Sequence, residues 1–226
     1  SKADSADDRA IFNVFLRVFN EKLGYCAEYP HIAHLERHLV QKGRYEAFKA
    51  AFRDAAGADW RDQRDAYSFH AEEIGIALST ALGMSVKDAD AWLTRFEAEF
   101  RPTIENFARW VAEYVDSEGP GHRIVFLADE IGAFIGSNTD RMLNLQTIVE
   151  NLGTTCKGGA WVIVTSQADM DVILGDVQGS KKNDFSKIQG RFGARLSLSG
   201  SHADEVIQRR LLAKTPDAEA ELGRLY

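Results

Sequence analysis

Residues 123–130, with the sequence Arg-Ile-Val-Phe-Leu-Ala-Asp-Glu, decide the fold of this chain. Their apolar part has the length of a strand and no alternation of polar and apolar residues, which predicts a strand buried on both faces, as in a parallel sheet. A second run of this kind covers residues 161–166 (Trp-Val-Ile-Val-Thr-Ser), and residues 139–152 between the two runs have helical spacing. Strand, helix and strand in this order predict a parallel βαβ unit.

The alternation of strands and helices continues toward the C-terminus. A turn-rich break at residues 117–121 precedes the first strand, and a polar loop at residues 175–183 follows the second. We expect a short helix at residues 184–189, a third strand at residues 195–198 and a helix at residues 203–213. Residues 121–201 are therefore predicted to be an α/β region with a parallel sheet and crossover helices, and residues 202–226 the start of a C-terminal helical region.

The first half of the chain has a different pattern. Apolar residues recur with helical spacing, no β-like alternation occurs before residue 122, and glycines such as Gly24 and Gly83 mark helix ends. Ser85 and Thr103 stand where N-cap residues are expected. Residues 1–120 are therefore predicted to be a large all-helical region that precedes the α/β region. Its first helix, at residues 7–23, is predicted to turn an apolar stripe inward: Ile11, Val14, Phe15, Val18, Phe19 and Leu23.

The composition is that of a globular protein. The 226 residues include 27 Lys and Arg against 34 Asp and Glu, which gives a net charge of −7, and 45% of them are hydrophobic. These values exclude a disordered or collagenous chain and argue against a large nucleic-acid footprint on this chain. Two cysteines are too few for a disulfide framework, so we expect a cytoplasmic protein. The sequence has no apolar run approaching the ~18 residues of a membrane span.

Both ends of the sequence have features that we expect of a segment of a longer protein. Residue 1 is Ser, and neither an initiator Met nor a signal-peptide pattern is present. Near the other end, Thr215, Pro216 and Asp217 form a helix start that comes only a few residues before the sequence stops.

Two carboxylates, Asp129 and Glu130, directly follow the first predicted strand. Ligand sites of parallel sheets lie at the carboxyl ends of strands. An apolar strand followed by Asp-Glu is the Walker B pattern of P-loop nucleotide hydrolases, in which the Asp holds Mg²⁺ and the next carboxylate orients and deprotonates the attacking water. We therefore predict that Asp129 binds the metal and the nucleotide, and that Glu130 is the catalytic base.

The second predicted strand also ends in polar residues, namely Thr165, Ser166 and Gln167. In nucleotide hydrolases of the AAA+ class, a polar residue at this place, called sensor 1, lies between Walker B and the γ-phosphate. We predict this cofactor-binding role for Thr165 or Gln167, and the pattern does not choose between them. Ser166 is equally consistent with a hydroxyl that caps the next helix.

The predicted helix at residues 184–189 is followed by Gly190, Arg191 and Phe192. This segment resembles the part of AAA+ proteins that carries the arginine finger, which reaches the ATP of a neighbouring subunit and stabilises charge on the transferring phosphoryl group. Arg191 is the better candidate for this catalytic role, and Arg195 is the second. The Gly-x-x-x-x-Gly-Lys-[Ser/Thr] pattern of a P-loop does not occur in the sequence. We therefore predict a partial AAA+-like P-loop sheet whose P-loop lies upstream of Ser1.

Three stretches carry a resemblance to one protein family. They are residues 145–153 (LQTIVENLG), 160–169 (AWVIVTSQAD) and 184–192 (DFSKIQGRF), and residues 14–25, 29–36 and 64–67 agree with them. Together they resemble the BrxC family of ATPases from BREX bacteriophage-exclusion systems, over nearly the whole chain. The resemblance implies a much longer protein, with its P-loop just before this segment and with the helical first half inserted between the P-loop region and Walker B.

The resemblance also implies a function. Proteins of this family act with other BREX components, including a DNA methyltransferase, to mark host DNA and stop phage replication. For the full-length protein, the resemblance implies ATP and Mg²⁺ as cofactors, a homo-oligomer, contact with DNA through the complex and no membrane. ATP hydrolysis is expected to drive assembly or remodelling of the defence complex. This chain alone is expected neither to bind ATP tightly nor to hydrolyse it, because the phosphate-binding backbone is missing.

Three other interpretations stay open. A non-catalytic helical docking platform on a degenerate nucleotide-binding fold would bind partners without turnover, although the two carboxylates and Arg191 argue against full degeneracy. A Mg²⁺-dependent nuclease would need more clustered carboxylates than the sequence shows. His31, His34 and His38 share one helix face and could bind Zn²⁺, but no Cys pair or Glu-x-x-His pattern supports such a site.

Overall fold

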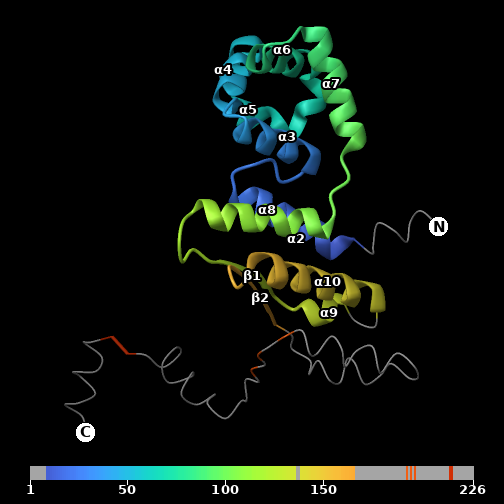
Figure 1. Ribbon diagram of the computed structural model, residues 1–226, viewed down its shortest axis with the longest axis vertical. Coiled ribbons are helices and arrows are strands. Elements are labelled where there is room, and N and C mark those ends of the chain that lie inside the picture. Colours follow the sequence, from blue (N-terminus) through green and yellow to red (C-terminus); the bar gives the residue numbers. More distant parts are fainter. Residues whose placement is uncertain are drawn as a thin grey trace. The chain divides into compact units, whose positions relative to one another are not determined.

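The structure is a computed structural model of the chain, and it describes residues 9–135 and 138–165, together with residues 192, 194, 196, 214 and 215. The chain divides into two compact units, Ser1–Arg191 and Phe192–Tyr226. All helices and strands below belong to the first unit (Figure 1). The third strand predicted at residues 195–198 and the helices predicted at residues 184–189 and 203–213 lie outside the described residues, except for Leu196.

The described part of the first unit is mostly helical and contains a two-stranded parallel sheet. In chain order, its elements are α2 (Ala10–Lys22), α3 (Pro30–Gln41), α4 (Tyr45–Ala56), α5 (Trp60–Gln63), the 3₁₀ helix η1 (Arg64–Phe69), α6 (Ala71–Leu82), α7 (Val86–Glu99), α8 (Ile104–Ser117), β1 (Ile124–Ala128), α9 (Ile131–Ile135), α10 (Thr139–Cys156) and β2 (Ala160–Val164). The predicted caps are present: Ser85 accepts a hydrogen bond from the N–H of Asp88, and Thr103 accepts one from the N–H of Asn106. None of the described helices is long and apolar enough to cross a bilayer.

Helices α3 to α7 pack around a hydrophobic core of their own, and Figure 1 shows them grouped together. Trp60 is fully buried in this core and lies edge-on against Phe48 and Phe52, with ring centroids 5.1 Å apart in both pairs. Ile74 and Leu78 of α6 are fully buried beside them. Each such side chain contributes about 1.5–3 kcal/mol of stability through burial. This core includes no residue of the sheet, although α3 also contacts α8, where Arg37 lies over the Trp110 ring at 4.4 Å.

Helices α2 and α8 pack against the sheet. Phe126 of β1 contacts Phe15 of α2 at 5.3 Å and Phe107 of α8 at 5.9 Å between ring centroids. Helix α10, which joins the two strands, packs on α8 and α2, and Asn144 of α10 accepts a 3.2 Å hydrogen bond from the N–H of Phe12. The predicted boundary between a helical region and an α/β region at residue 120 stays a prediction. Helices α2 and α8 precede this residue and yet pack in the same core as the sheet.

The two strands pair in parallel, with a register that runs from Ile124 opposite Ala160 to Ala128 opposite Val164. Helix α10 makes the crossover connection between them. The strand–helix–strand unit predicted from the sequence is therefore confirmed. Because the strands are parallel and in register, their carboxyl ends lie side by side.

One face of the sheet is open in the described part of the chain, which corrects the prediction of strands buried on both faces. Ile124 and Phe126 point toward the helices and are buried, whereas Val125 and Leu127, which alternate with them, are 53% and 70% exposed. On β2, Trp161 is also more than half exposed. A continuous apolar run does not reveal whether both faces have a partner. Here the described helices cover one face only.

The inward face of α2 also differs from the prediction. Ile11, Phe15 and Phe19 are buried as expected, but Val14 and Val18 are about half exposed. Phe12 and Leu16 are buried in their place. Both stripes have helical spacing, and the larger apolar side chains are the ones that face α8 and the sheet.

Candidate functional site

The residues that follow β1 and β2 meet at the carboxyl end of the sheet. Ala128 and Val164 form the last pair of the register, so Asp129 and Thr165 come next on neighbouring strands. Two backbone hydrogen bonds continue beyond this pair: the N–H of Thr165 donates to Ala128 O at 3.0 Å, and the N–H of Ile131 donates to Thr165 O at 3.1 Å. The position of Thr165 relative to Asp129 is therefore fixed by main-chain contacts on both sides.

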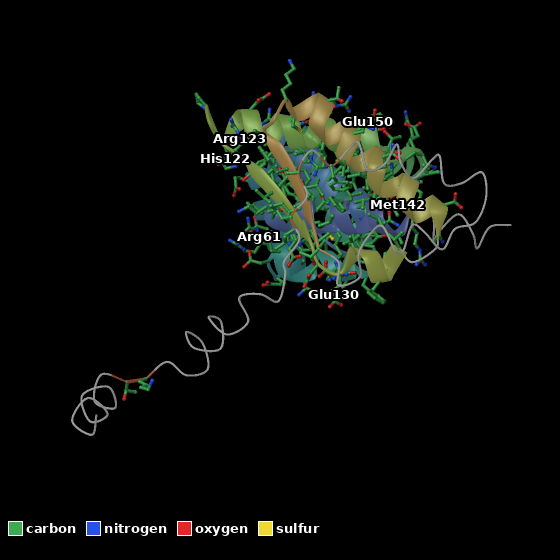
Figure 2. All side chains as sticks on the ribbon, turned by 90° about the horizontal axis from the view of Figure 1, so that it is seen from below. Arg61, His122, Arg123, Glu130, Met142 and Glu150 are labelled. Carbon is green, nitrogen blue, oxygen red and sulfur yellow. The ribbon has the colours of Figure 1, made fainter. Side chains whose placement is uncertain are left out.

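The hydroxyl of Thr165 connects the two carboxylate residues. It donates a hydrogen bond to Oδ1 of Asp129 and accepts one from the N–H of Glu130 at 3.0 Å. The same N–H lies 3.1 Å from Oδ1 of Asp129. Figure 2 shows Glu130 at this end of β1, and His122 and Arg123 at the opposite end. Of the two candidates for sensor 1, Thr165 thus touches both predicted Walker B residues.

Glu130 has a left-handed backbone with φ +51°. This conformation costs roughly 1–2 kcal/mol for a residue with a Cβ, so contacts must hold it in place. The N–H of Glu130 is shared between Thr165 and Asp129, and the following residue, Ile131, is tied to β2. The strained turn presents the exposed side chain of Glu130 at the tip of the strand, immediately before α9.

The residues present fit a magnesium ion bound together with a phosphorylated ligand. In the described part of the chain, no group of three or more His, Cys, Asp or Glu side chains could hold a metal ion by itself. Mg²⁺ does not need such a group, because it usually keeps several waters and binds through one or two carboxylates and the phosphates of its ligand. Asp129 provides one exposed carboxylate of this kind at the carboxyl end of β1.

The other predicted site residues lie outside the described part of the chain. Ser166 and Gln167 come directly after Thr165, where the described stretch stops. Arg191 and Arg195 are also not described. Their roles as sensor and as arginine finger stay predictions. The described site therefore consists of Asp129, Glu130 and Thr165.

The three histidines of α3 take part in aromatic packing. The His34 ring is stacked on Phe96 of α7, with centroids 5.0 Å apart, and His38 lies 5.6 Å from Trp92. Burial lowers the pKa of His34 to about 4, so its imidazole is neutral near pH 7. His34 and His38 therefore pack on α7, while the ring of His31 contacts Tyr29 and Tyr67.

Sequence reasoning missed a buried polar cluster around Glu36, which is fully buried on α3. Its carboxylate accepts hydrogen bonds from the Tyr45 hydroxyl at 2.7 Å, from Trp60 Nε1 at 2.8 Å and from Arg64 at 3.1 Å. The backbone N–H of Cys26 donates to its other oxygen at 2.5 Å. One pattern could have indicated the cluster: Glu36 lies one helical turn after the buried Ile32 and so on the inward face of α3.

No protein-family model matches the chain, and no solved structure matches it.

Proposed function

We propose that this chain supplies the acidic, water-activating end of the sheet in an AAA+-like ATPase of the BREX phage-defence type. The observation that carries the proposal is the contact between Asp129, Glu130 and Thr165 at the carboxyl ends of two adjacent parallel strands. A Walker B motif and a neighbouring polar sensor require these residue types in this place.

Each of the three residues has a separate role in this proposal. Asp129 binds Mg²⁺, which neutralises charge on the phosphates of ATP when it is present. Glu130 orients the attacking water and accepts its proton as a general base. Thr165 holds Asp129 and the backbone of Glu130 through one hydroxyl. Gln167 remains the alternative for the contact with the γ-phosphate.

The proposal needs a phosphate-binding loop from a part of the protein outside this sequence. The sequence contains no P-loop pattern. The open face of the sheet is consistent with a larger α/β fold, because parallel sheets normally have both faces covered. In the proposed arrangement, the described strands are the Walker B and sensor 1 strands of a larger P-loop sheet, and the described helices cover one of its faces.

The proposed biological role follows from the family resemblance. The full-length protein forms a homo-oligomer and acts with other BREX components, including a DNA methyltransferase, and contacts DNA through that complex. ATP hydrolysis drives assembly or remodelling of the defence complex. The proposed cellular location of the protein is the cytoplasm.

The proposal is tested by replacing Glu130 in the full-length protein. Glu130→Gln should leave ATP binding intact and lower turnover by ~10²-fold or more, because the amide cannot accept the proton of the water. Glu118→Gln, which changes an exposed glutamate at the end of α8, is the matched control and should leave turnover unchanged. Turnover of Glu130→Gln at the wild-type rate would show that Glu130 is not the base.

A second pair of variants tests Thr165. Thr165→Ser keeps a hydroxyl that can make both hydrogen bonds, whereas Thr165→Val keeps the shape and loses them. Under the proposal, Thr165→Ser retains most of the ATPase activity and Thr165→Val loses most of it, with ATP affinity measured in parallel. Equal activity of the two variants would remove Thr165 from the site.

Arg191 is tested by mixing subunits. Arg191→Ala should remove hydrolysis in an oligomer, because an arginine finger contributes roughly 10³–10⁵ to the rate. Mixed oligomers of Arg191→Ala and Glu130→Gln subunits should recover part of the activity, since each subunit supplies what the other lacks. No recovery in mixtures that do assemble would assign Arg191 a role within its own subunit.

One observation favours the alternative of a helical docking platform. Helices α3 to α7 have a core that is independent of the sheet, so they can present a surface without taking part in nucleotide chemistry. Partner binding through the helices is compatible with ATP hydrolysis at the sheet, whereas the non-catalytic alternative requires partner binding without any turnover. Loss of partner binding without loss of ATPase activity, after a change in the helices, would establish the platform role.

A further inference from the structure

A pocket of about 390 Å³ lies on the helical group, where the ends of α3 and α6 meet the side of α7. This volume is within the ~300–1,000 Å³ that ligand pockets usually have. The pocket combines three basic side chains with three apolar ones. Its lining consists of His38, Lys42, Arg44, Leu82, Met84 and Trp92.

The basic side chains of the pocket have no acidic partner within the described part of the chain. Lys42 and Arg44 are exposed and make no ion pair or side-chain hydrogen bond with any described residue. No acidic residue is among the described residues that line the pocket. Burial and the neighbouring Lys42 lower the pKa of His38, so near pH 7 the pocket carries the charges of Lys42 and Arg44. The positive charge of this pocket contrasts with the net charge of −7 of the whole chain.

Arg44 does not stabilise the helix at whose start it lies. Arg44 is the N-cap residue of α4, and its side chain makes no capping hydrogen bond. A cation at this end of a helix opposes the helix dipole, whereas Lys42, at the C-terminal end of α3, complements it. Arg44 thus slightly destabilises α4, and it lines a pocket that contains no acidic residue of the described chain.

The floor of the pocket is apolar and only partly covered. Leu82, Met84 and Trp92 pack against the core of the helical group but stay half-buried. Unbranched methionine adapts to apolar groups of different shapes, which is why it is common at peptide-binding surfaces. The floor is therefore suited to one aliphatic or aromatic side chain.

We propose that this pocket binds a short acidic peptide segment of a partner protein, with one large apolar side chain inserted between Leu82, Met84 and Trp92. Carboxylates on either side of that anchor pair with Lys42 and Arg44 in charge-assisted hydrogen bonds. The proposal does not depend on ATP hydrolysis, because none of these residues belongs to the sheet or its carboxyl end.

A peptide fits the pocket better than a nucleic acid does. Bases bound without sequence preference stack on free aromatic rings, but Trp92 is already stacked on Phe96, with ring centroids 4.9 Å apart. A nucleic acid strand would also extend beyond two cations, onto a chain whose net charge repels it. A segment with two or three carboxylates needs only the local charge of Lys42 and Arg44.

The experiment uses a fluorescein-labelled peptide with a central leucine flanked on both sides by aspartates, and measures fluorescence anisotropy at low salt. Saturable binding is expected, and it should weaken as salt is added, because exposed charges are screened. Arg44→Glu and Lys42→Glu should each weaken binding about tenfold or more. Lys87→Glu, which changes an exposed cation of α7 that does not line the pocket, should leave it unchanged.

Two altered peptides separate the parts of the proposal. Replacing the central leucine by alanine should weaken binding about tenfold, and replacing the aspartates by lysines should abolish it. Circular dichroism of each protein variant establishes that it is folded. The proposal is overturned by non-saturable binding, by equal affinity of the leucine and alanine peptides, by an unchanged affinity of Arg44→Glu, or by tighter binding of a single-stranded oligonucleotide that Arg44→Glu also weakens.

Discussion

Helices α3 to α7 surround the polar groups in their core, whereas the sheet leaves both polar and apolar side chains at the surface. Glu36 is fully buried, and four donors from different parts of the helical group converge on its carboxylate. At the sheet, Asp129 and Thr165 are exposed, and Leu127 next to them lies on the open face. Buried polar groups with full hydrogen bonding specify one packing arrangement, while exposed groups stay available for chemistry or for a partner.

The largest difference that we predict is between the two faces of β1. Phe126→Ala removes a buried ring that contacts Phe15 and Phe107, and should lower the free energy of unfolding by about 3–5 kcal/mol. Leu127→Ala, one residue further on the open face, should change it by less than ~0.5 kcal/mol, as expected for a surface substitution. Urea unfolding measures both values. Equal losses would mean that the open face is covered in solution.

The second prediction tests the buried carboxylate of the helical group. Glu36→Gln keeps the shape of the side chain but removes the charge that Arg64 faces and one acceptor oxygen. It should cost about 2–3 kcal/mol of stability, because hydrogen bonds to a charged group are lost inside the core. Glu46→Gln, at an exposed ion pair with Lys49, is the control and should cost less than ~1 kcal/mol. Similar losses for the two variants would mean that the buried charge of Glu36 does not stabilise the helical group.

The third prediction is an acid sensitivity located in the helical group. Burial, together with Arg37 and other nearby cations, lowers the pKa of His34 from 6.5 to about 4. The unfolded chain therefore binds a proton between about pH 6.5 and 4 that the folded chain does not bind, so stability falls as the pH falls through this window. The pKa values of His31 and His38 are shifted in the same direction.

The variant that tests this prediction is His34→Phe, which keeps an aromatic ring against Phe96. Between pH 7 and pH 5, the wild type should lose on the order of 1 kcal/mol more stability than the variant, with an allowance for the partial exposure of His34. Urea unfolding at the two pH values measures the difference. Identical pH dependence of the two proteins would assign the acid sensitivity to other groups.

The smallest predicted effect concerns backbone strain at the sheet. Glu130→Gly relieves the left-handed conformation and should raise stability by about 0.5–1 kcal/mol, while it abolishes the proposed base. Lys157, at the end of α10, has φ +49° and no role in the proposed site, so Lys157→Gly should give a similar gain without loss of ATPase activity in the full-length protein. A loss of stability in Glu130→Gly would mean that contacts of its side chain outweigh the strain.

Several features of the fold could be predicted from short sequence patterns. Gly83 ends α6 and Ser85 begins α7, because a left-handed glycine and a capping hydroxyl act within one or two turns of the chain. The parallel pairing of residues 124–128 with residues 160–164 followed from two apolar runs with a helix between them. These features depend on neighbours in the sequence, or on a connection that only one handedness satisfies.

The candidate site was predictable in part for the same reason. Asp129 and Glu130 follow a strand, and Thr165 follows the next one, so parallel pairing alone brings them to one edge of the sheet. Two features of the site could not be predicted from the sequence: the contact of the Thr165 hydroxyl with both residues, and the left-handed backbone of Glu130. Both depend on the register and on the path that the chain takes after the strand.

What the sequence by itself determined is the set of elements: helices in the first half, two parallel strands in the second, and polar residues after each strand. Only the tertiary structure decided which faces are covered. Val14 and Val125 belong to runs that predict burial, yet both are more than half exposed, while the charged Glu36 is fully buried. Periodicity reports that an apolar face exists, but burial depends on which distant element packs against it, and a buried charge depends on donors such as Tyr45 and Trp60 that only the folded chain brings together.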